Sequence, residues 1–250
     1  MPLILCLHGA GSNQQIFEMQ TAKLRACLGD TYEFVYVHAP IASSAGPGML
    51  PIFASAGPYY SWFSVSGRRR KEEIAEIQNV VRVTVDAVEA GRMPNLKARE
   101  VHGIMAFSQG AIVGTMLLLQ QHAGMLPWFP KLKLGIFICA DYSEALTTCV
   151  EPLTAERKGK DQPKARLLSL PSIHLYGTVD PHGRKSRKMT ESHFQRSHCQ
   201  VMWFNGSHQC PTGRGDCEKA SVLIASLEDS SCKTDEEITT ASTIVDSQQD

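Results

Sequence analysis

The segment around Ser108 has the residues of a nucleophile elbow, a sharp turn that exposes a reactive serine between a strand and a helix. An apolar run ends at Phe107, Ser108 follows, and an apolar helix-like run begins at Gln109. Such a turn needs small residues two positions before and two positions after the serine, because two backbones pass each other there. Gly110 meets this need, and Ala106 stands where a glycine is usual. The context therefore predicts that Ser108 is a nucleophile rather than an ordinary turn residue.

A nucleophilic serine needs a general base and an acid that orients the base. When the serine lies on such an elbow, the acid and then the histidine follow it along the chain. His208 fits the base, because the turn at 205–207 places it directly after the last strand-like run. Asp180 fits the acid, because it follows a strand and a glycine turn, and Asp141, one strand earlier, is the alternative.

Two backbone N–H groups should bind the negative oxygen that forms when the serine attacks a carbonyl. One is the N–H of Gln109, directly after the nucleophile, and the other comes from the loop after the first strand. That loop, HGAGSN at 8–13, has glycines that permit a turn in which the Ala10 N–H points inward. It lacks the lysine of a P-loop and the full spacing of a dinucleotide-binding loop, so a phosphate site is the weaker interpretation. This chemistry needs no metal and no organic cofactor.

The elements that must position these residues alternate between strand and helix character, the pattern of a parallel sheet covered by helices. Apolar runs rich in β-branched residues predict strands at 3–7, 33–37, 101–107, 133–139, 172–176 and 200–204. Apolar spacing predicts helices at about 71–90, 109–121 and 216–227. The predicted class is α/β, with a mostly parallel sheet, helices on both faces and a small irregular lid from the Gly- and Pro-rich segment 40–63.

Composition excludes several other classes of protein. The 250 residues carry 25 Lys and Arg against 25 Asp and Glu, a net charge of zero that is unlike a nucleic-acid-binding domain. The apolar runs are shorter than the ~20 residues of a membrane-spanning helix, and no secretory signal is visible. The eight scattered cysteines predict reduced thiols in a cytoplasmic protein. From 229 onward the chain is acidic and poor in large apolar residues, which predicts one domain at 1–228 and a disordered tail at 229–250.

The chain resembles the fungal family of α/β-hydrolase serine hydrolases that includes a human ovarian-tumour-associated relative. The resemblance spans about residues 2–228 and is carried by LCLHGAG at 5–11, FSQGA at 107–111, the turn with Gly177 and Asp180, and GSH at 206–208. Within the family the chain is most similar to polyketide-pathway thioesterases such as the lovastatin-pathway releasing enzyme, through stretches at 32–37, 43–48, 57–63 and 126–128. Gln109 stands where that enzyme has a glutamate.

The resemblance implies an α/β-hydrolase fold with Ser108, Asp180 and His208 as its triad. It also implies hydrolytic release of a polyketide acyl chain from a synthase, whose acyl-carrier domain would be the partner. The main alternative is a carboxylesterase acting on an acetyl or other small ester in secondary metabolism. Candidates for an acyl pocket come from the irregular segment and from a second apolar loop at 124–131: Tyr59, Tyr60, Trp62, Leu126 and Trp128, with Met49, Leu50, Phe53 and Phe129 as further candidates.

Three other interpretations of the sequence do not involve hydrolysis. An α/β-hydrolase fold without catalytic activity would bind a ligand at the same place. The basic run at 68–71 is a candidate for carrier docking or localisation, although a solvated loop is the commoner role of such a run. A zinc or interaction module is disfavoured because its possible ligands contain no C-x-x-C pair: His193, His198, Cys199, His208, Cys210 and Cys217.

Overall fold

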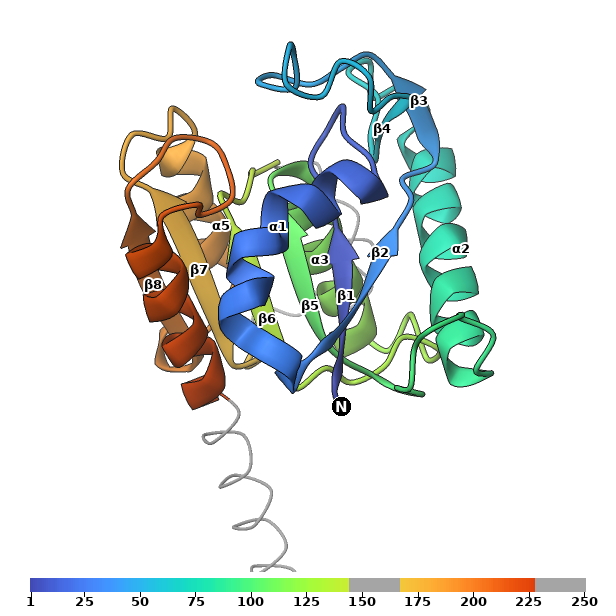
Figure 1. Ribbon diagram of the computed structural model, residues 1–250. Coiled ribbons are helices and arrows are strands. Elements are labelled where there is room, and N and C mark those ends of the chain that lie inside the picture. Colours follow the sequence, from blue (N-terminus) through green and yellow to red (C-terminus); the bar gives the residue numbers. More distant parts are fainter. Residues whose placement is uncertain (144–166, 228–250) are drawn as a thin grey trace, which may run out of the picture.

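A six-stranded sheet with the order β2-β1-β5-β6-β7-β8 forms the centre of the protein (Figure 1). The computed structural model describes residues 1–143 and 167–227, and the tail predicted at 229–250 lies outside them. Every neighbouring pair of strands in this sheet is parallel, which confirms the predicted α/β class. Its strands are β1 (Leu3–Leu7), β2 (Glu33–Val37), β5 (Val101–Phe107), β6 (Leu134–Ile138), β7 (Ser172–Gly177) and β8 (Cys199–Phe204).

Helices cover both faces of the sheet (Figure 1). One layer contains α2 (Arg70–Glu89), α3 (Gln109–His122) and α5 (Gly183–His193). The other layer contains α1 (Gln14–Leu28) and a C-terminal helix at 214–227. Side chains on β1 alternate between these layers: Leu5 and Leu7 face the first, and Cys6 faces the second. Strands buried on both faces read as continuous apolar runs, which explains why they were predictable.

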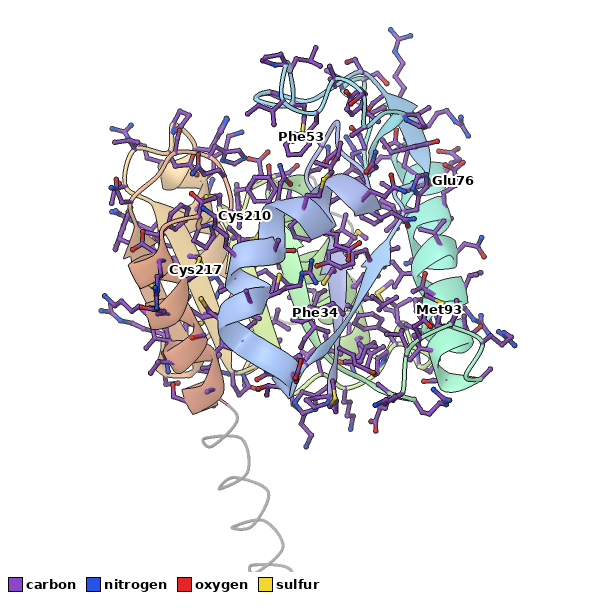
Figure 2. The ribbon with its side chains drawn as sticks, viewed as in Figure 1. Phe34, Phe53, Glu76, Met93, Cys210 and Cys217 are labelled. Atoms are coloured by element: carbon purple, nitrogen blue, oxygen red, sulfur yellow. The ribbon has the colours of Figure 1, made fainter. Side chains whose placement is uncertain are left out.

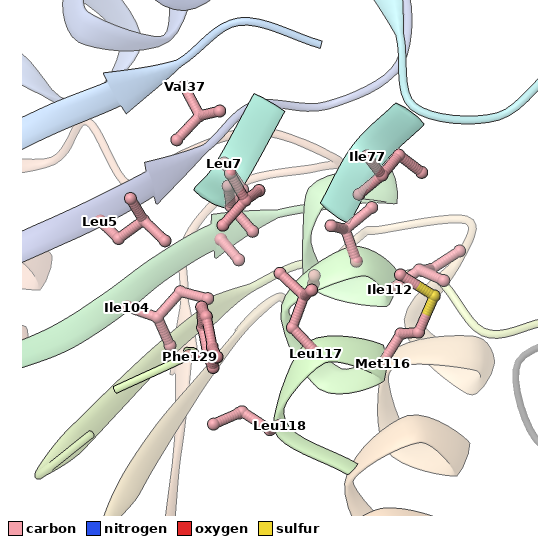
Figure 3. Packing of buried hydrophobic residues seen from close by; sticks show 14 of the residues in the cluster. Leu5, Leu7, Val37, Ile77, Ile104, Ile112, Met116, Leu117, Leu118 and Phe129 are labelled. Atoms are coloured by element: carbon pink, nitrogen blue, oxygen red, sulfur yellow. The ribbon is translucent and has the colours of Figure 1, made fainter. Parts of the chain in front are cut away.

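An apolar core fills the space between the sheet and the helix layer that contains α3, the helix that begins directly after the predicted nucleophile. Figure 3 shows Leu5 of β1 and Ile104 of β5 on the sheet side of this cluster, and Leu117 of α3 and Ile77 of α2 on its helix side. All four side chains are fully buried. This packing anchors the helix that starts directly after Ser108.

The irregular segment 40–63 forms a small two-stranded antiparallel sheet above the carboxyl edge of the main sheet (Figure 1). Its strands are β3 (Ile41–Ser43) and β4 (Tyr59–Ser61). Two backbone hydrogen bonds join it to the loop after β1: Ser12 N–H donates to Tyr60 O at 3.1 Å, and Tyr60 N–H donates to Ser12 O at 2.7 Å. The predicted lid is therefore attached to the loop that carries Ala10.

The connections after β1 and β5 lead to opposite sides of the sheet. From β1 the chain runs through α1 to β2, and from β5 it runs through α3 to β6. Ligands of open parallel sheets bind at the carboxyl ends of strands where the connections diverge in this way. The site of interest is therefore the carboxyl edge at β1 and β5. In the described part of the chain, no helix is long and apolar enough to cross a membrane.

Candidate active site

Ser108 lies at this edge in a strained backbone conformation. Its φ and ψ are 51° and −116°, a region that non-glycine residues rarely occupy. Three hydrogen bonds hold the turn: Ser108 N–H donates to Ile138 O at 3.1 Å, and Ser108 O accepts from Ala111 N–H at 3.0 Å and Asp141 N–H at 3.2 Å. The strain and its support are those of a nucleophile elbow.

The small residues of the elbow have a clear packing role. A Cβ atom on Gly110 would lie 2.3 Å from Leu7 O and 2.5 Å from His8 O, so α3 approaches the end of β1 too closely for any side chain there. Ala106, which replaces the usual glycine, has its methyl group opposite Gly114, where an added Cβ would lie 3.6 Å away. That distance is an ordinary van der Waals contact, and the close neighbour of Gly114 is Ile104, whose Cδ1 would lie 2.9 Å from the added Cβ.

The structure brings Ser108, His208 and Asp180 together in one line of hydrogen bonds. His208 Nε2 lies 2.8 Å from Ser108 Oγ, and His208 Nδ1 lies 3.0 and 3.1 Å from the two carboxylate oxygens of Asp180. The side chain of Asp180 is 1% exposed and that of His208 is 22% exposed. A carboxylate buried against Nδ1 fixes the imidazole so that Nε2 can accept the serine proton.

The turn with Asp180 and the loop with His208 are packed against each other backbone to backbone. Thr178 N–H donates to Phe204 O, and Val179 N–H donates to Gly206 O, both at 3.0 Å. A Cβ atom on Gly177 would lie 2.2 Å from Ser207 O, so a glycine is needed where the two loops meet. This contact sets the distance between the acid and the base.

Cys139 supports the His208 loop from below and is a residue that sequence reasoning missed. It follows β6, has a φ of 43° and is fully buried. Its Sγ lies 3.5 Å from Gln209 O and 3.7 Å from Ser207 O, the carbonyls on either side of His208. Burial raises the pKa of this thiol to about 12, so the S–H remains a donor. The continuous apolar run that contains it gave no sign of this role.

The donor atoms of Cys139, Asp180 and His208 lie within 4.8 Å of one another, which raises the question of a metal site. The Cys139 S–H donates to the carbonyls of Ser207 and Gln209, and both imidazole nitrogens of His208 are already paired with Ser108 and Asp180. The group therefore fits a proton-transfer site better than a metal centre. Of the six residues considered for zinc, only His208 belongs to this group, and within the described part of the chain no other set of three such side chains lies as close together.

His8 orients the loop that carries Ala10. Its Nε2 accepts from Ala39 N–H at 3.3 Å, so in the neutral ring Nδ1 carries the proton and donates to Gly9 O at 2.7 Å. Burial lowers the pKa of His8 to about 4, which keeps the ring neutral. Within one trans peptide the C=O and N–H point in opposite directions. Because the ring holds Gly9 O, the Ala10 N–H is directed away from the ring.

The alternative acid, Asp141, and a histidine next to the site, His182, make other contacts. The Asp141 carboxylate accepts from Lys185 Nζ at 2.9 Å and from Tyr142 N–H at 2.9 Å, rather than from His208. His182 lies against the catalytic candidate His208, with ring centroids 4.8 Å apart, but its backbone N–H donates to Asp180 at 2.7 Å. The geometry therefore favours Asp180 over Asp141 as the acid.

The pocket candidates fall into two groups. Leu126 and Trp128 follow the end of α3, and with 14 residues at about 1.5 Å each that end lies roughly 20 Å along the helix from Ser108. They pack in or against the core there, so the structure does not bring these two pocket candidates to Ser108. Tyr59 and Tyr60 lie in β4 above the sheet edge, and Trp62 directly after it is fully buried.

One cavity of the described part of the chain lies away from Ser108. It has a volume of about 690 Å³ and is lined by Leu118, Lys133, Pro171 and Cys199 among others. These residues lie at the amino ends of β6, β7 and β8 and near the end of α3. The cavity is thus at the edge of the sheet opposite to the elbow.

Comparison with known proteins agrees with this geometry. Residues 1–220 match the family described as serine hydrolase (FSH1). Esterase mlcF of Penicillium citrinum is 37% identical over 221 residues, 86% of each chain. The dihydromonacolin L-[lovastatin nonaketide synthase] thioesterase of Aspergillus terreus is 37% identical over 245 residues, 90% of this chain and 94% of that protein. Thioesterase FSL2 of Gibberella zeae is 31% identical over 239 residues, 92% and 94% of the two chains.

Solved structures support the fold alone. A Bacillus cereus carboxylesterase superposes with a TM-score of 0.54 at 16% identity, covering 90% of this chain and 88% of that one. Zea mays acyl-protein thioesterase 2 superposes with a TM-score of 0.52 at 16% identity, covering 91% and 94%. Both have the arrangement of sheet and helices described above.

Proposed function

The chain belongs to the FSH1 family of serine hydrolases, and from that premise we propose that it is a thioesterase that releases a polyketide acyl chain from the carrier domain of a synthase. We assign Ser108 as the nucleophile, His208 as the general base and Asp180 as the acid that orients it. The observation that carries this assignment is the line of hydrogen bonds that starts at the strained Ser108 and ends at a buried carboxylate.

The first half of the cycle transfers the acyl group to the enzyme. His208 Nε2 takes the proton of Ser108 Oγ while Oγ attacks the thioester carbonyl, and the Ala10 and Gln109 N–H groups bind the resulting oxyanion. Collapse of the tetrahedral intermediate breaks the C–S bond, and the protonated His208 gives its proton to the leaving thiolate. Asp180 remains ionised and stabilises the imidazolium.

The second half of the cycle transfers the acyl group to water. His208 removes a proton from a water molecule that attacks the ester carbonyl of the acyl-enzyme, and the same two N–H groups bind the oxyanion again. The C–Oγ bond then breaks, Ser108 recovers its proton from His208, and a carboxylic acid leaves. Tyr59 and Tyr60 of the lid are our candidates for contact with the acyl chain.

The substrate class is tested by comparing two matched substrates. We expect an acyl-carrier domain loaded with a hexanoyl chain to be hydrolysed with a kcat/KM at least tenfold above that of the oxygen ester of the same chain. Ser108→Ala should abolish both reactions. A Ser108→Ala protein with full turnover would overturn the mechanism.

A carboxylesterase is the second candidate, and it is favoured by the relatives whose names contain esterase alone, such as esterase mlcF. Higher kcat/KM on an acetyl or other small oxygen ester than on any carrier-bound thioester would decide for it. We place the activity in the cytoplasm, which is supported by the six described cysteines, all of which are free thiols.

A further inference from the structure

The two oxyanion donors of the proposed mechanism lie on separate segments of the chain. Ala10 is in the loop after β1, and Gln109 is the first residue of α3. The side chain of Gln109 reaches across to the segment after β4. Its Oε1 accepts from Trp62 N–H at 2.8 Å and from Phe63 N–H at 3.4 Å, and its Nε2 donates to Phe63 O at 3.4 Å.

The segment that Gln109 holds is in turn attached to the loop with Ala10. Trp62 Nε1–H donates to His8 O at 2.7 Å, and Gly11 N–H donates to Ser61 Oγ at 2.9 Å. Trp62 is fully buried and its ring lies 5.2 Å from that of His8. A continuous set of hydrogen bonds therefore runs from the start of α3, through Trp62, to both sides of Ala10.

We propose that Gln109 is a positioning residue of the oxyanion hole, in addition to its role as a donor. Its backbone N–H is one donor, and its side-chain amide, acting through Trp62, holds the loop that presents the other donor, Ala10. The inference rests on the proposed serine-hydrolase mechanism and adds the element that fixes the spacing of its two donors.

The spacing needs such an element because oxyanion stabilisation depends on donors about 2.7–3.1 Å from the oxygen, and small displacements of either donor weaken it. On one side, the contact of Gly110 with the carbonyls of Leu7 and His8 fixes where the loop begins. On the other side, the segment with Trp62 fixes where the loop ends, and the Gln109 amide ties that segment to α3. Without the amide, the hydrogen bonds named above no longer join that segment to α3, and apolar packing of Trp62 in the shared core is what connects them.

Two substitutions at position 109 separate the hydrogen bonds from the volume of the side chain. Gln109→Leu keeps a similar volume and removes all three side-chain hydrogen bonds. Gln109→Glu keeps an oxygen that can accept from Trp62 N–H and Phe63 N–H and loses only the donation to Phe63 O. Both leave the backbone N–H of residue 109 in place, so a change in oxyanion binding does not come from loss of that donor.

The chain offers a matched control in the same helix. Gln120 of α3 is buried, and its Oε1 accepts from Gln78 Nε2 of α2 at 3.0 Å, near the end of α3 that is distant from Ser108. Gln120→Leu thus removes a buried amide contact between α3 and a neighbouring segment without touching the site. It measures what a merely structural loss does to catalysis.

The experiment measures kcat and KM on a hexanoyl N-acetylcysteamine thioester, the inhibition constant of a trifluoromethyl ketone with a hexyl chain, and the melting temperature. Ser108 Oγ adds to the carbonyl of the ketone and forms a tetrahedral adduct with a negative oxygen. The affinity for the ketone therefore measures how well the two N–H donors bind an oxyanion. For Gln109→Leu we expect kcat to fall by about 10- to 100-fold, while KM stays within about threefold of the wild-type value. The inhibition constant of the ketone should rise by the same factor by which kcat/KM falls. Gln109→Glu should lose less than about fivefold, and Gln120→Leu should lower the melting temperature while kcat stays at the wild-type value.

Three results would overturn the proposal: a Gln109→Leu enzyme with wild-type kcat, unchanged ketone affinity despite a lower kcat, or an equal loss of kcat in Gln120→Leu. If Gln109→Leu does not fold, Gln109→Asn, which is one methylene too short to reach Trp62 N–H, carries the same expectation. Failure of the proposed function is a different result, because the wild-type protein would then hydrolyse neither esters nor thioesters and would not bind the ketone.

Discussion

His174 of β7 should make the protein less stable in weak acid. Its ring is fully buried between Phe137 and Phe194, with centroids 5.2 and 4.8 Å away. Its Nδ1 lies 2.9 Å from Thr190 Oγ1 and its Nε2 lies 3.2 Å from Ser172 Oγ. Burial lowers the pKa of His174 from 6.5 to about 3, so the folded protein keeps this ring neutral where the unfolded chain binds a proton.

The size of the effect follows from the difference between the two pKa values. One pKa unit corresponds to about 1.36 kcal/mol, so the difference between 6.5 and about 3 amounts to roughly 5 kcal/mol when fully expressed. The stability is fully present above pH 6.5 and is lost as pH falls from there toward 3, about 2 kcal/mol of it by pH 5. His8, whose pKa burial lowers to about 4, adds a loss of about 2 kcal/mol by pH 5. A total of about 4 kcal/mol is a large part of the 5–15 kcal/mol typical of a domain.

Urea unfolding followed by tryptophan fluorescence at pH 5, 6, 7 and 8 tests this reasoning. The free energy of unfolding of the wild-type protein should fall by about 4 kcal/mol between pH 8 and 5 through these two histidines, and that of His174→Gln by about 2 kcal/mol less. Thr190→Val is the control, because it removes a hydrogen bond of His174 but keeps the ring and should retain the wild-type pH dependence. If His174→Gln and the wild-type protein lose stability in parallel, His174 is not held neutral and the reasoning is refuted.

Three further predictions concern the site. Asp180→Asn should lower kcat of thioester hydrolysis by about 10³- to 10⁴-fold. Asp141→Asn should change kcat by less than about fivefold, because the Asp141 carboxylate faces Lys185. The reverse order of the two effects would make Asp141 the acid. Gly177→Ala should lower the free energy of unfolding by about 1–3 kcal/mol in urea titrations, because its Cβ would overlap Ser207 O. Gly183→Ala is the control and should not destabilise the protein, because the space around its Cβ is open. Equal free energies of unfolding for the two variants would contradict the packing argument. The buried Cys139 thiol, with a pKa of about 12, should remain unmodified by iodoacetamide at pH 8 in peptide maps of the folded protein, and rapid labelling would show that it is accessible.

The sheet was predictable because its strands are buried on both faces. All six strands lie within one residue of the predicted bounds, since continuous apolar runs end where the chain leaves the core. Helix α5 was missed for the opposite reason. Its buried side is made mostly of polar residues, Ser186, Thr190 and His193 with Met189, so the sequence has no apolar stripe there. Helix α1 was also missed, because the buried Thr21, whose hydroxyl donates to Phe17 O, interrupts its apolar stripe.

The site was predictable where chemistry fixes the order of residues along the chain, and not where it depends on contacts across an irregular segment. Ser108, Asp180 and His208 follow strand ends, and parallel strand ends meet at one edge. The contact of Gln109 with Trp62 joins residues 47 positions apart. It was not predictable, because Trp62 lies in the irregular segment 40–63, whose path has no periodic pattern in the sequence. Leu126 and Trp128 do not lie near Ser108, because the length of α3 carries them to its far end.

The most direct test of the proposed mechanism is mass spectrometry of the intact protein quenched during turnover of a hexanoyl thioester. The mechanism predicts one hexanoyl group per molecule, located by peptide mapping on Ser108, that forms with release of one thiol and is absent in Ser108→Ala. A hexanoyl group on another residue, or turnover without any acyl-enzyme in which Ser108→Ala remains active, would contradict it.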